Sequence, residues 1–376
     1  QARVQFEARE EHRPIYEVLA IEPECGLCRL PEPSPVDLFL DLEGDPYVKP
    51  SGREYLFGLG RFDERGQFAY RAWWAITADE ERAAFDDLIG EMTKVVEADP
   101  AAHIYHYAPY EPSAMKRLMG RGAIRETDVD NLLRGDRFVD LYAVVRESVR
   151  AGVESYSIKK MEPFYGFTRD VELARAGDQR RIVELALETG DLSGVTTDVR
   201  QSVEGYNRDD VRSTAELRTW LEILRHELVV MGAEIPRFVS TDGAASDDVK
   251  ERQRRIETLR ERLLAMAADV PIGAAGQFTD GAPGQLSVGA PGRSSIGAPG
   301  QSSVGAPGLQ PWGQSSLYPR AEALGLHSGQ ALGLHLLAFL LDWHYREDKV
   351  TWWEYFRLLD LADEDLLDES GAVAGL

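Results

Sequence analysis

Apolar residues cluster in short strand-like segments early in the chain and recur at helical spacing further on. Three segments rich in Leu, Phe, Tyr and Trp, at residues 36–43, 54–62 and 67–76, are separated by Gly, Pro and Asp turns. This pattern predicts an antiparallel meander of strands. Over residues 78–97 the apolar positions have helical spacing and acids fill the first turn, so a helix is expected after the third strand.

The pattern then predicts one more sheet segment and a run of helices. A short apolar strand is expected at 103–107, followed by a helix through Met115 and Leu118. After an apolar segment at 138–141 the spacing is mostly helical up to about residue 231. This order predicts an α/β fold with a mixed sheet flanked by helices, and it resembles the ribonuclease H-like fold. The length fits one domain at residues 36–235.

The sequence beyond this domain divides into three parts. Residues 236–270 contain a charged helix rich in Arg and Glu, which is more typical of a spacer than of a site. Residues 271–317 include GAPG repeats with a period of eight residues, a composition that cannot bury enough apolar surface to become ordered, so a flexible linker is expected. Residues 318–376 return to apolar helical spacing and predict a small helical unit.

Composition and charge narrow the class of protein. No apolar run reaches the roughly 18 to 20 residues of a membrane-spanning helix, and no leader pattern opens the chain, so a cytoplasmic protein without a membrane anchor is expected. The net charge of −22 argues against binding nucleic acid through the overall field. The charge does not exclude a local basic path for an anionic ligand, nor a carboxylate metal site, which is acidic until cations bind.

Two cysteines lie in the lead-in segment, residues 1–35. Cys25 and Cys28 form a lone CxxC. A zinc site would need two further ligands, and a redox pair would need a strand before it and a helix after it, whereas a Pro-rich stretch follows. An ordinary reduced pair is therefore the favoured interpretation.

Two carboxylates stand on the first expected strand. FLDLEGDP, residues 39–46, places Asp41 and Glu43 two apart, so both side chains project from the same face. Burying an unpaired pair of carboxylates on an apolar strand is costly, and a divalent cation would supply the compensating charge. The alternative is a strand end at which both acids meet solvent.

A second motif pairs a phenol with a carboxylate. YNRDDVRSTAEL, residues 206–217, is expected to open an amphipathic helix on which Tyr206 and Asp210, four apart, share a face. The alternative is an ordinary helix start, with Asp209 and Asp210 near the positive end of the helix dipole. In combination with the first motif, the pair indicates one shared site.

A third acid stands where a strand is expected to turn into a helix. HIYHYAPYEPSAMKRLM, residues 103–119, places Glu111 at this junction. Strand ends are where sites collect in α/β sheets, which makes Glu111 a candidate ligand. A plain acid in the first turn of a helix is the alternative.

These three motifs, in this order, resemble the exonuclease motifs of the DEDD superfamily. In that family a strand DxE, a strand-to-helix motif of HNxxFD form and a YxxxD helix together bind two divalent metals. The spacing of Tyr206 resembles that of the tyrosine branch. The middle motif departs from the family, because Tyr107 replaces the usual Asn and Glu111 the usual Asp. The resemblance implies two Mg²⁺ or Mn²⁺ ions held by Asp41, Glu43, Glu111 and Asp210.

Residues 30–224 resemble more closely the YprB-type ribonuclease H-like domain found within bacterial RecB-like nuclease and helicase proteins. The likeness rests on LPEPSPVDLFLDLEGDP, FVDLYAVVRESV, SYSIKKMEPFYGF and YNRDD. The tail, HLLAFLLDWHYREDKVTWWEYFRLLDL, is similar to the segment that connects such a domain to a superfamily 1 helicase. The sequence contains neither a RecB-type nuclease core nor a Walker A motif. RecB-like nuclease and superfamily 1 helicase domains are therefore expected partners within a longer parent protein.

The resemblance implies a metal-dependent 3′ to 5′ exonuclease acting on single-stranded DNA or RNA. Asp41 would bridge the two ions, and Tyr206, whose ordinary pKa is about 10, would orient the attacking water. Weaker candidates are Tyr107 for substrate contact, Asp140 for a hydrogen bond that supports a ligand, and Lys159 and Lys160 for phosphate contact. A helix-cap role for Asp140 and a solvated helix face for the two lysines are the alternatives.

Two non-catalytic interpretations remain open on the sequence alone. One is an RNase H-like module that binds nucleic acid with weak or no cleavage, favoured by the acidic charge and the altered middle motif. The other is an adaptor between nuclease and helicase domains. The retained spacing of the candidate site residues favours catalysis, because a scaffold has no physical need for them.

Overall fold

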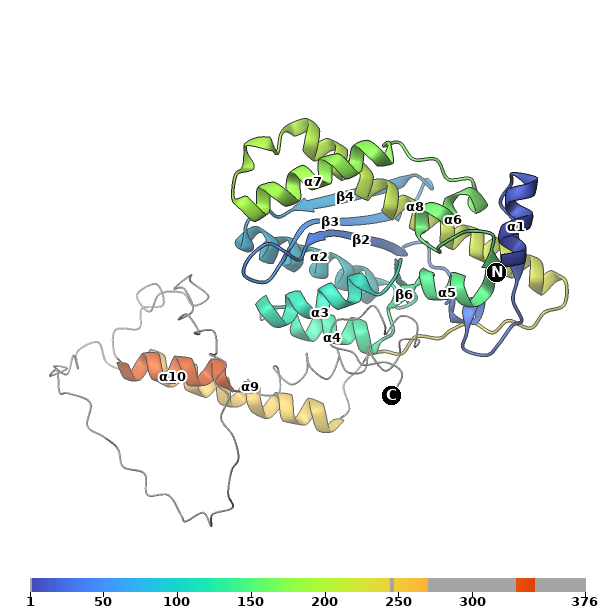
Figure 1. Cartoon of the computed structure of the whole chain (residues 1–376). Coiled ribbons are helices and arrows are strands. Elements are labelled where there is room, and N and C mark those ends of the chain that lie inside the picture. Colours follow the sequence, from blue (N-terminus) through green and yellow to red (C-terminus); the bar gives the residue numbers. More distant parts are fainter. Residues whose placement is uncertain (1, 123, 244–246, 270–328, 342–376) are drawn as a thin grey trace, which may run out of the picture. The chain divides into compact units, whose positions relative to one another are not determined.

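The computed structural model describes residues 2–122, 124–243, 247–269 and 329–341 and divides them into two units (Figure 1). The first unit contains the described residues up to 243, and the second contains α9 (Asp247–Ala268) and α10 (Gly329–Leu340). Within the described residues, no helix combines the length and apolar character needed to cross a lipid bilayer.

A five-stranded mixed sheet forms the centre of the first unit. β2 (Leu38–Asp45), β3 (Arg53–Phe62) and β4 (Phe68–Trp74) pair as an antiparallel meander. β5 (Ile104–His106) pairs in parallel with the other edge of β2, and β6 (Phe138–Asp140) pairs in parallel with β5. The sheet order is therefore β4-β3-β2-β5-β6, and the predicted strands are confirmed.

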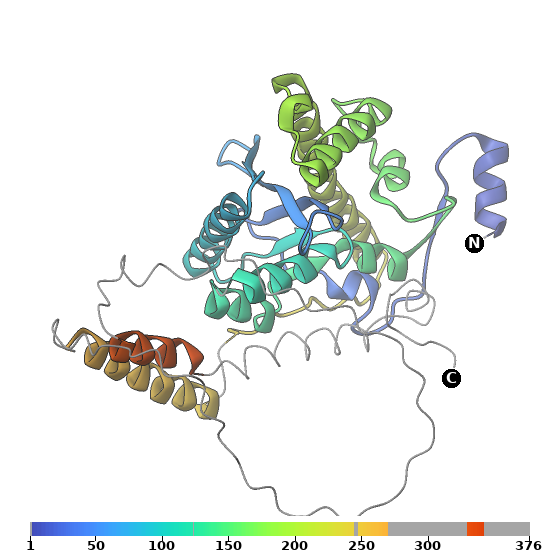
Figure 2. The same ribbon diagram turned by 60° about the vertical axis from the view of Figure 1, so that its left-hand side comes forward.

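Helices cover both faces of this sheet, as Figures 1 and 2 show. The α/β class with a mixed sheet flanked by helices, predicted from the sequence, is confirmed. The helices of this unit are α1 (Ala2–Glu11), α2 (Ala78–Ala98), α3 (Tyr110–Gly122), α4 (Glu126–Arg134), α5 (Leu141–Ser148), α6 (Ile158–Tyr165), α7 (Leu173–Thr189) and α8 (Thr197–Val230).

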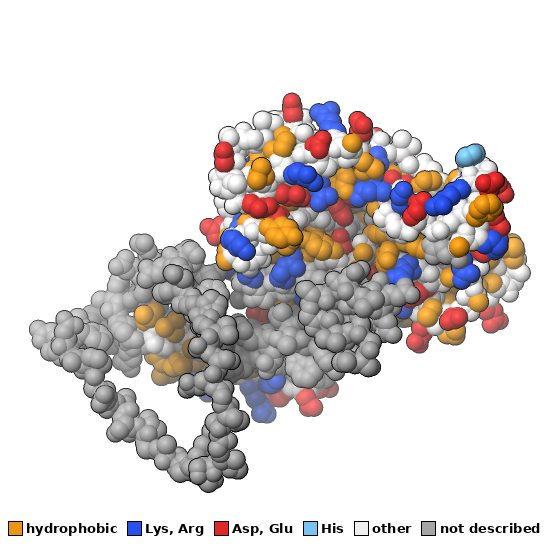
Figure 3. Space-filling model, viewed as in Figure 1, with side chains coloured by type: hydrophobic (Ala, Val, Ile, Leu, Met, Phe, Trp, Pro, Cys, Tyr) orange, Lys and Arg blue, Asp and Glu red, His pale blue; other side chains and the backbone are white. Residues whose placement is uncertain are grey.

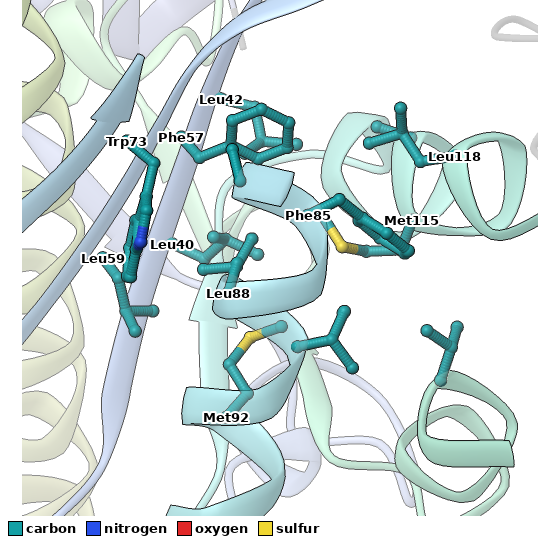
Figure 4. Close-up of a cluster of buried hydrophobic side chains, with 14 of the residues drawn as sticks. Leu40, Leu42, Phe57, Leu59, Trp73, Phe85, Leu88, Met92, Met115 and Leu118 are labelled. Carbon is teal, nitrogen blue, oxygen red and sulfur yellow. The ribbon is translucent and has the colours of Figure 1, made fainter. Parts of the chain in front are cut away.

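One face of the sheet packs on α2, α3 and α4. β2 presents Leu40 and Leu42 to this face, where they join the buried Phe85 and Met115 of the helices (Figure 4). α2 begins with a capping box, in which Thr77 accepts a hydrogen bond from the backbone of Glu80 and the Glu80 side chain accepts one in return. These apolar contacts leave the opposite face of β2 to a different set of helices.

The opposite face packs on α5 and α8. Phe39 and Tyr105, from β2 and β5, stack with a ring separation of 5.5 Å and join Leu217 and Leu221 of α8 in a second buried cluster. The side chains of a strand alternate between its faces, so the face of β2 that carries Phe39 also carries the odd-numbered residues that follow.

The helix that carries the YxxxD motif begins earlier than the sequence analysis expected. α8 starts at Thr197, with the Thr196 side chain accepting a hydrogen bond from Val199 N at 3.3 Å. Tyr206 and Asp210 therefore lie in the helix interior, and the expected helix start at residue 206 is wrong. The reason is an apolar stripe upstream, where buried Val199 and Val203 pack against α7 and β3.

The lead-in segment packs onto the first unit. β1 (Tyr16–Val18) pairs antiparallel with β7 (Val149–Ala151), and Val4 of α1 is buried. Cys25 and Cys28 are free cysteines, and Cys28 lies in a short 3-10 helix, η1 (Gly26–Arg29), within the cluster that α5 and α8 share. A second such helix, η2 (Leu192–Gly194), links α7 and α8. The domain boundaries given above stay a prediction.

The second unit contains the charged helix and part of the expected C-terminal helical segment. α9 lies within the segment where the charged helix was expected, and α10 packs against it through contacts that include Arg260 Nε to Ala338 O at 3.3 Å. The linker expected at 271–317 and the rest of the segment expected at 318–376 lie outside the described residues.

Candidate metal centre

β2 delivers two carboxylates to the face that α8 covers. Asp41 and Glu43 follow Phe39 on the odd-numbered face, so they point away from the core around Leu40. Asp41 is half-buried and Glu43 is buried. The pairing of β2 with β3 shifts register between Glu43 and Gly44, so the strand becomes irregular directly after the second carboxylate.

α8 brings a third carboxylate to the same place. Ligand oxygens of Asp41, Glu43 and Asp210 all lie within 4.8 Å of one another. The predicted convergence of the first and last motifs is therefore present in the structure, although the motifs are far apart in sequence. Three carboxylates at this spacing offer the hard oxygen ligands that divalent cations such as Mg²⁺ prefer.

A buried asparagine fixes α8 against β2. Asn207 Nδ2 donates a hydrogen bond to Asp41 Oδ2 at 2.6 Å and to Asp41 O at 3.3 Å. Its Oδ1 accepts a hydrogen bond from Tyr70 Oη at 2.7 Å. Asn207 is fully buried, and a Cβ at Gly58 would lie 1.8 Å from its Oδ1, so only glycine fits beneath it.

Burial and mutual repulsion act on the strand carboxylates. Burial raises the pKa of Asp41 well above its ordinary value, and Asp210 and Glu43 raise it further. Burial also raises the pKa of Glu43, to about 8, although Arg180 opposes the shift. Carboxylates in this condition bind either protons or cations, because their charged forms lack sufficient compensation.

Three cationic side chains compensate part of this charge. Arg180 of α7 lies with Nε 3.0 Å from Glu43 Oε2. Arg169, between α6 and α7, donates to Asp210 Oδ1 at 2.5 Å, and Lys159 Nζ of α6 lies 3.7 Å from Asp210 Oδ2. Two of the three carboxylates thus form direct ion pairs.

Tyr206 lies among these cations. The centroid of its ring is 4.9 Å from Lys159 Nζ, 5.4 Å from Arg180 Cζ and 5.5 Å from Arg169 Cζ. Burial raises the pKa of the Tyr206 phenol, and the Asp210 charge raises it further. The phenol therefore stays protonated at neutral pH, where it can donate a hydrogen bond.

Glu111 occupies the junction that the sequence predicted but is outside the group of three. It lies in the first turn of α3, buried, with Oε2 at 3.5 Å from His106 Nδ1. Glu111 Oε2 has no hydrogen-bond partner among the described residues. Burial raises the pKa of Glu111, although His106 opposes the shift. The Glu111 charge contributes to the raised pKa of Asp41.

The weaker candidates have other contacts in the structure. Asp140 caps α5, accepting hydrogen bonds from Tyr142 N at 2.8 Å and from Ala108 N at 2.9 Å. The Tyr107 hydroxyl donates to the Tyr156 carbonyl. Of the two lysines, Lys159 contacts Asp210 in the site, whereas Lys160 pairs with Glu154 at 3.7 Å.

The sequence analysis missed three residues of the site. Arg169 and Arg180 lie just before α7 and on it. Nothing in the sequence pattern predicts that this part of the chain packs beside the carboxylates. Asn207 had a signal, since it stands three residues before Asp210 and so shares a helix face with it.

Comparison with known families supports the fold. Residues 38–222 match a family model described as the RNase_H superfamily. The match begins at the first residue of β2 and ends within α8, so it spans all three carboxylates of the group. Neither the curated proteins nor the solved structures compared with the chain gave a match.

Proposed function

We propose that this chain is a metal-dependent nuclease that hydrolyses phosphodiester bonds, with residues 38–222, which match the RNase H superfamily, as its catalytic domain. The single observation that carries the proposal is the meeting of Asp41, Glu43 and Asp210, with oxygens within 4.8 Å of one another. Members of this superfamily are generally nucleases, and a carboxylate group of this kind is the metal site such chemistry requires.

The residues present fit divalent cations. All three side chains offer carboxylate oxygens, and a fourth buried oxygen, Glu111 Oε2, is without a hydrogen-bond partner among the described residues. The raised pKa of Glu43, about 8, indicates that the cations already in place compensate its charge incompletely. Mg²⁺ or Mn²⁺ would be held by Asp41, Glu43 and Asp210, with Glu111 as the fourth ligand of a two-ion site.

The finer proposal is a 3′ to 5′ exonuclease of the tyrosine branch. Its support is the placement of Tyr206 one helical turn before Asp210, in the midst of Lys159, Arg169 and Arg180. The bound ions would supply acidification of water and neutralisation of the charge that develops on the leaving 3′ oxygen.

The chain's own residues bind and orient in this mechanism. Tyr206 holds its proton, so its hydroxyl donates to and accepts from neighbours as an orienting group for the attacking water, without acting as a full base. Asn207 fixes Asp41 relative to α8 through the hydrogen bond at 2.6 Å. Packing of α8 on β2 excludes bulk solvent from Glu43, which strengthens every charge interaction in the site.

The substrate class and partners are also part of the proposal. Single-stranded DNA or RNA is the proposed substrate, and RecB-like nuclease and superfamily 1 helicase domains of the same parent protein are the proposed partners. The charge of the whole chain, −22, implies that the strand is bound through a local cationic surface.

A module that binds nucleic acid without cutting is the second candidate function. The observation that favours it is that Arg180 and Arg169 already form ion pairs with Glu43 and Asp210. Ion pairs of this kind could neutralise the carboxylates permanently and exclude metal. A chain that serves only as an adaptor between nuclease and helicase domains would likewise bind no metal.

Release of nucleotides from the 3′ end tests the proposal. End-labelled single-stranded DNA and RNA are incubated with Mn²⁺ or Mg²⁺ and either the unaltered chain or Asp41→Asn. Asp87→Asn, which makes the same change at an exposed position of α2, is the matched control. We expect metal-dependent shortening that Asp41→Asn abolishes and Asp87→Asn retains. No cleavage of either polymer, with no metal binding by calorimetry, would exclude catalysis and support the adaptor.

A further inference from the structure

Two arginines reach the carboxylate group from the same side but are held differently. The side chain of Arg169 is largely buried, and it binds Glu162 through Nε at 3.1 Å and through Nη2 at 2.5 Å as well as Asp210. Glu162 is itself buried on α6 and accepts a further hydrogen bond from Ser213 of α8 at 3.1 Å. Arg169 therefore remains paired with the buried carboxylate of Glu162 even when Asp210 binds another partner.

Arg180 has no comparable anchor among the described residues. Its Nε lies 3.0 Å from Glu43, and its Nη2 lies 3.5 Å from Glu184, one turn further along α7. The side chain of Arg180 is 31% exposed, whereas that of Arg169 is 8% exposed. A cation that takes Glu43 as a ligand would leave the Arg180 guanidinium with the partly exposed Glu184 and the face of the Tyr206 ring, and neither of these is a buried anion.

Two divalent ions make the local charge positive. The four candidate ligands, together with Glu162 and Glu184, which pair with Arg169 and Arg180, carry six negative charges at most. Lys159, Arg169 and Arg180 carry three positive charges, and two divalent ions add four more, so the loaded site is positive even when every carboxylate is ionised. Figure 3 shows Lys and Arg side chains, interspersed with Asp and Glu, on the face over α7 and α6. The loaded site is therefore an anion site.

We propose that Arg180 is a phosphate-binding residue: it neutralises Glu43 while the site lacks metal, and binds a backbone phosphate of the nucleic-acid strand once metal occupies Glu43. The guanidinium presents planar paired donors that match a phosphate. Arg169 remains on Glu162 and positions Asp210 throughout. This inference rests on the proposed function, since it assumes that the anion is a nucleic-acid strand.

The inference requires opposite effects of one substitution on two ligands. Arg180→Gln removes a competitor of the metal, so calorimetry should show Mn²⁺ binding severalfold more tightly. The same change removes a phosphate contact, so binding of fluorescent oligothymidylate, measured by anisotropy in Ca²⁺, should weaken about tenfold. The slope of log affinity against log salt should fall by about 0.7, the value for one phosphate contact on a single strand.

Two further variants make the result interpretable. Arg181→Gln makes the same change at the next, exposed position of α7 and should leave both affinities unaltered. Arg180→Lys keeps the charge and should keep the salt slope, and it serves in place of Arg180→Gln if thermal melting shows that the glutamine variant does not fold. Arg180→Lys should bind the strand more weakly than the unaltered chain, because it lacks the paired donors of the guanidinium, while the slope of log affinity against log salt stays unchanged.

The outcomes separate this inference from the proposed function. Strand affinity equal to that of Arg181→Gln, or metal and strand affinities that weaken together, would overturn the role of Arg180. Cleavage by the unaltered chain is measured in parallel with Mn²⁺. Cleavage that persists while Arg180 variants bind the strand normally sinks this inference alone, whereas absent cleavage with the expected binding pattern sinks only the catalytic proposal.

Discussion

Asn207 of α8 and Asp41 of β2 are joined by a hydrogen bond of 2.6 Å between the amide nitrogen and a carboxylate oxygen. Asn207 is one turn of helix away from Asp210, so this hydrogen bond and the apolar packing of α8 on the sheet together hold the first and third carboxylates close to each other. Tyr70 of β4 orients the amide by donating to its oxygen at 2.7 Å. The amide is therefore fixed with its donor group toward Asp41.

Replacing this amide with a carboxylate should make the fold depend on metal. Asn207→Asp would add a fourth negative charge against Asp41, with an expected loss of about 3 kcal/mol in the free energy of unfolding when divalent ions are chelated. Addition of Mn²⁺ should recover part of the loss, because the ion stabilises the state that binds it. Chemical denaturation with chelator and with Mn²⁺ measures both values. Asn131→Asp, exposed on α4, is the control, and equal stability of the two variants would contradict the expectation.

A methyl group at Gly58 should disturb the same contact from below. The Cβ of Gly58→Ala would lie 1.8 Å from Asn207 Oδ1, so α8 or the asparagine must move. We expect a loss of about 1–3 kcal/mol in stability and reduced cleavage. Gly177→Ala, on α7 with nothing near its Cβ, should instead stabilise the chain by about 0.5–1 kcal/mol. Thermal melting of both variants checks this, and unimpaired cleavage by Gly58→Ala would count against the role given to Asn207.

Buried His103 should make the first unit sensitive to acid. Burial, and next the nearby Arg137, lower the pKa of His103 to about 4. The unfolded chain takes up this proton near pH 6.5 but the folded chain does not, so stability is lost as pH falls from about 6.5 to about 4. The shift corresponds to about 3 kcal/mol at the lower end.

The dependence of stability on pH must be compared between variants, because the titration of Asp37 changes the stability in the opposite direction to that of His103. Burial raises the pKa of Asp37 to about 6, so its protonation favours the folded state as pH falls. His103→Phe should remove the destabilising part of the acid slope, while His226→Phe, exposed on α8, should not. Denaturation at a series of pH values measures the slopes. Identical slopes for His103→Phe and the unaltered chain would refute the assignment.

Loss of the Asp140 cap should weaken both stability and cleavage. Asp140→Ala removes the acceptor for Tyr142 N and Ala108 N, at an expected cost of about 1–2 kcal/mol. Ala108 has a φ of 77° and leads into the turn before Glu111, so the turn should loosen and cleavage should fall. Asp191→Ala, which removes the exposed cap of η2, should leave cleavage unchanged. Denaturant melts and nucleotide release give the two readouts.

The sequence predicted the strand half of the site because strand geometry is local. The alternation of Leu40 and Leu42 with Asp41 and Glu43 determines which face each side chain takes, whatever packs there. The helical half was predicted in its spacing but not in its start. The acid-bearing motif has a signature of its own, whereas the true beginning of α8 depends on the Thr196 cap and on apolar residues that pack against distant elements.

The cations could not be predicted for a different physical reason. Arg169 precedes α7 and Arg180 lies on it, and both meet the carboxylates only because α7 packs against α8. No period in the sequence reports this tertiary contact. Glu111 was predictable in its position along the chain but not in its contacts. Its place at a strand-to-helix junction was predicted, while its approach to His106 depends on how the turn before α3 is built.

The alternation of β2 has a consequence for how this chain can change over generations. One side of the strand holds hydrophobic packing and the other holds the carboxylates, so substitutions on either side can be tested by selection almost independently. An inserted or deleted residue before Asp41 would move every following side chain to the opposite face of the strand. The acids would then be buried among the apolar side chains, and the leucines would lie in the charged site. Variation in this strand should therefore proceed by replacement and never by a change of length.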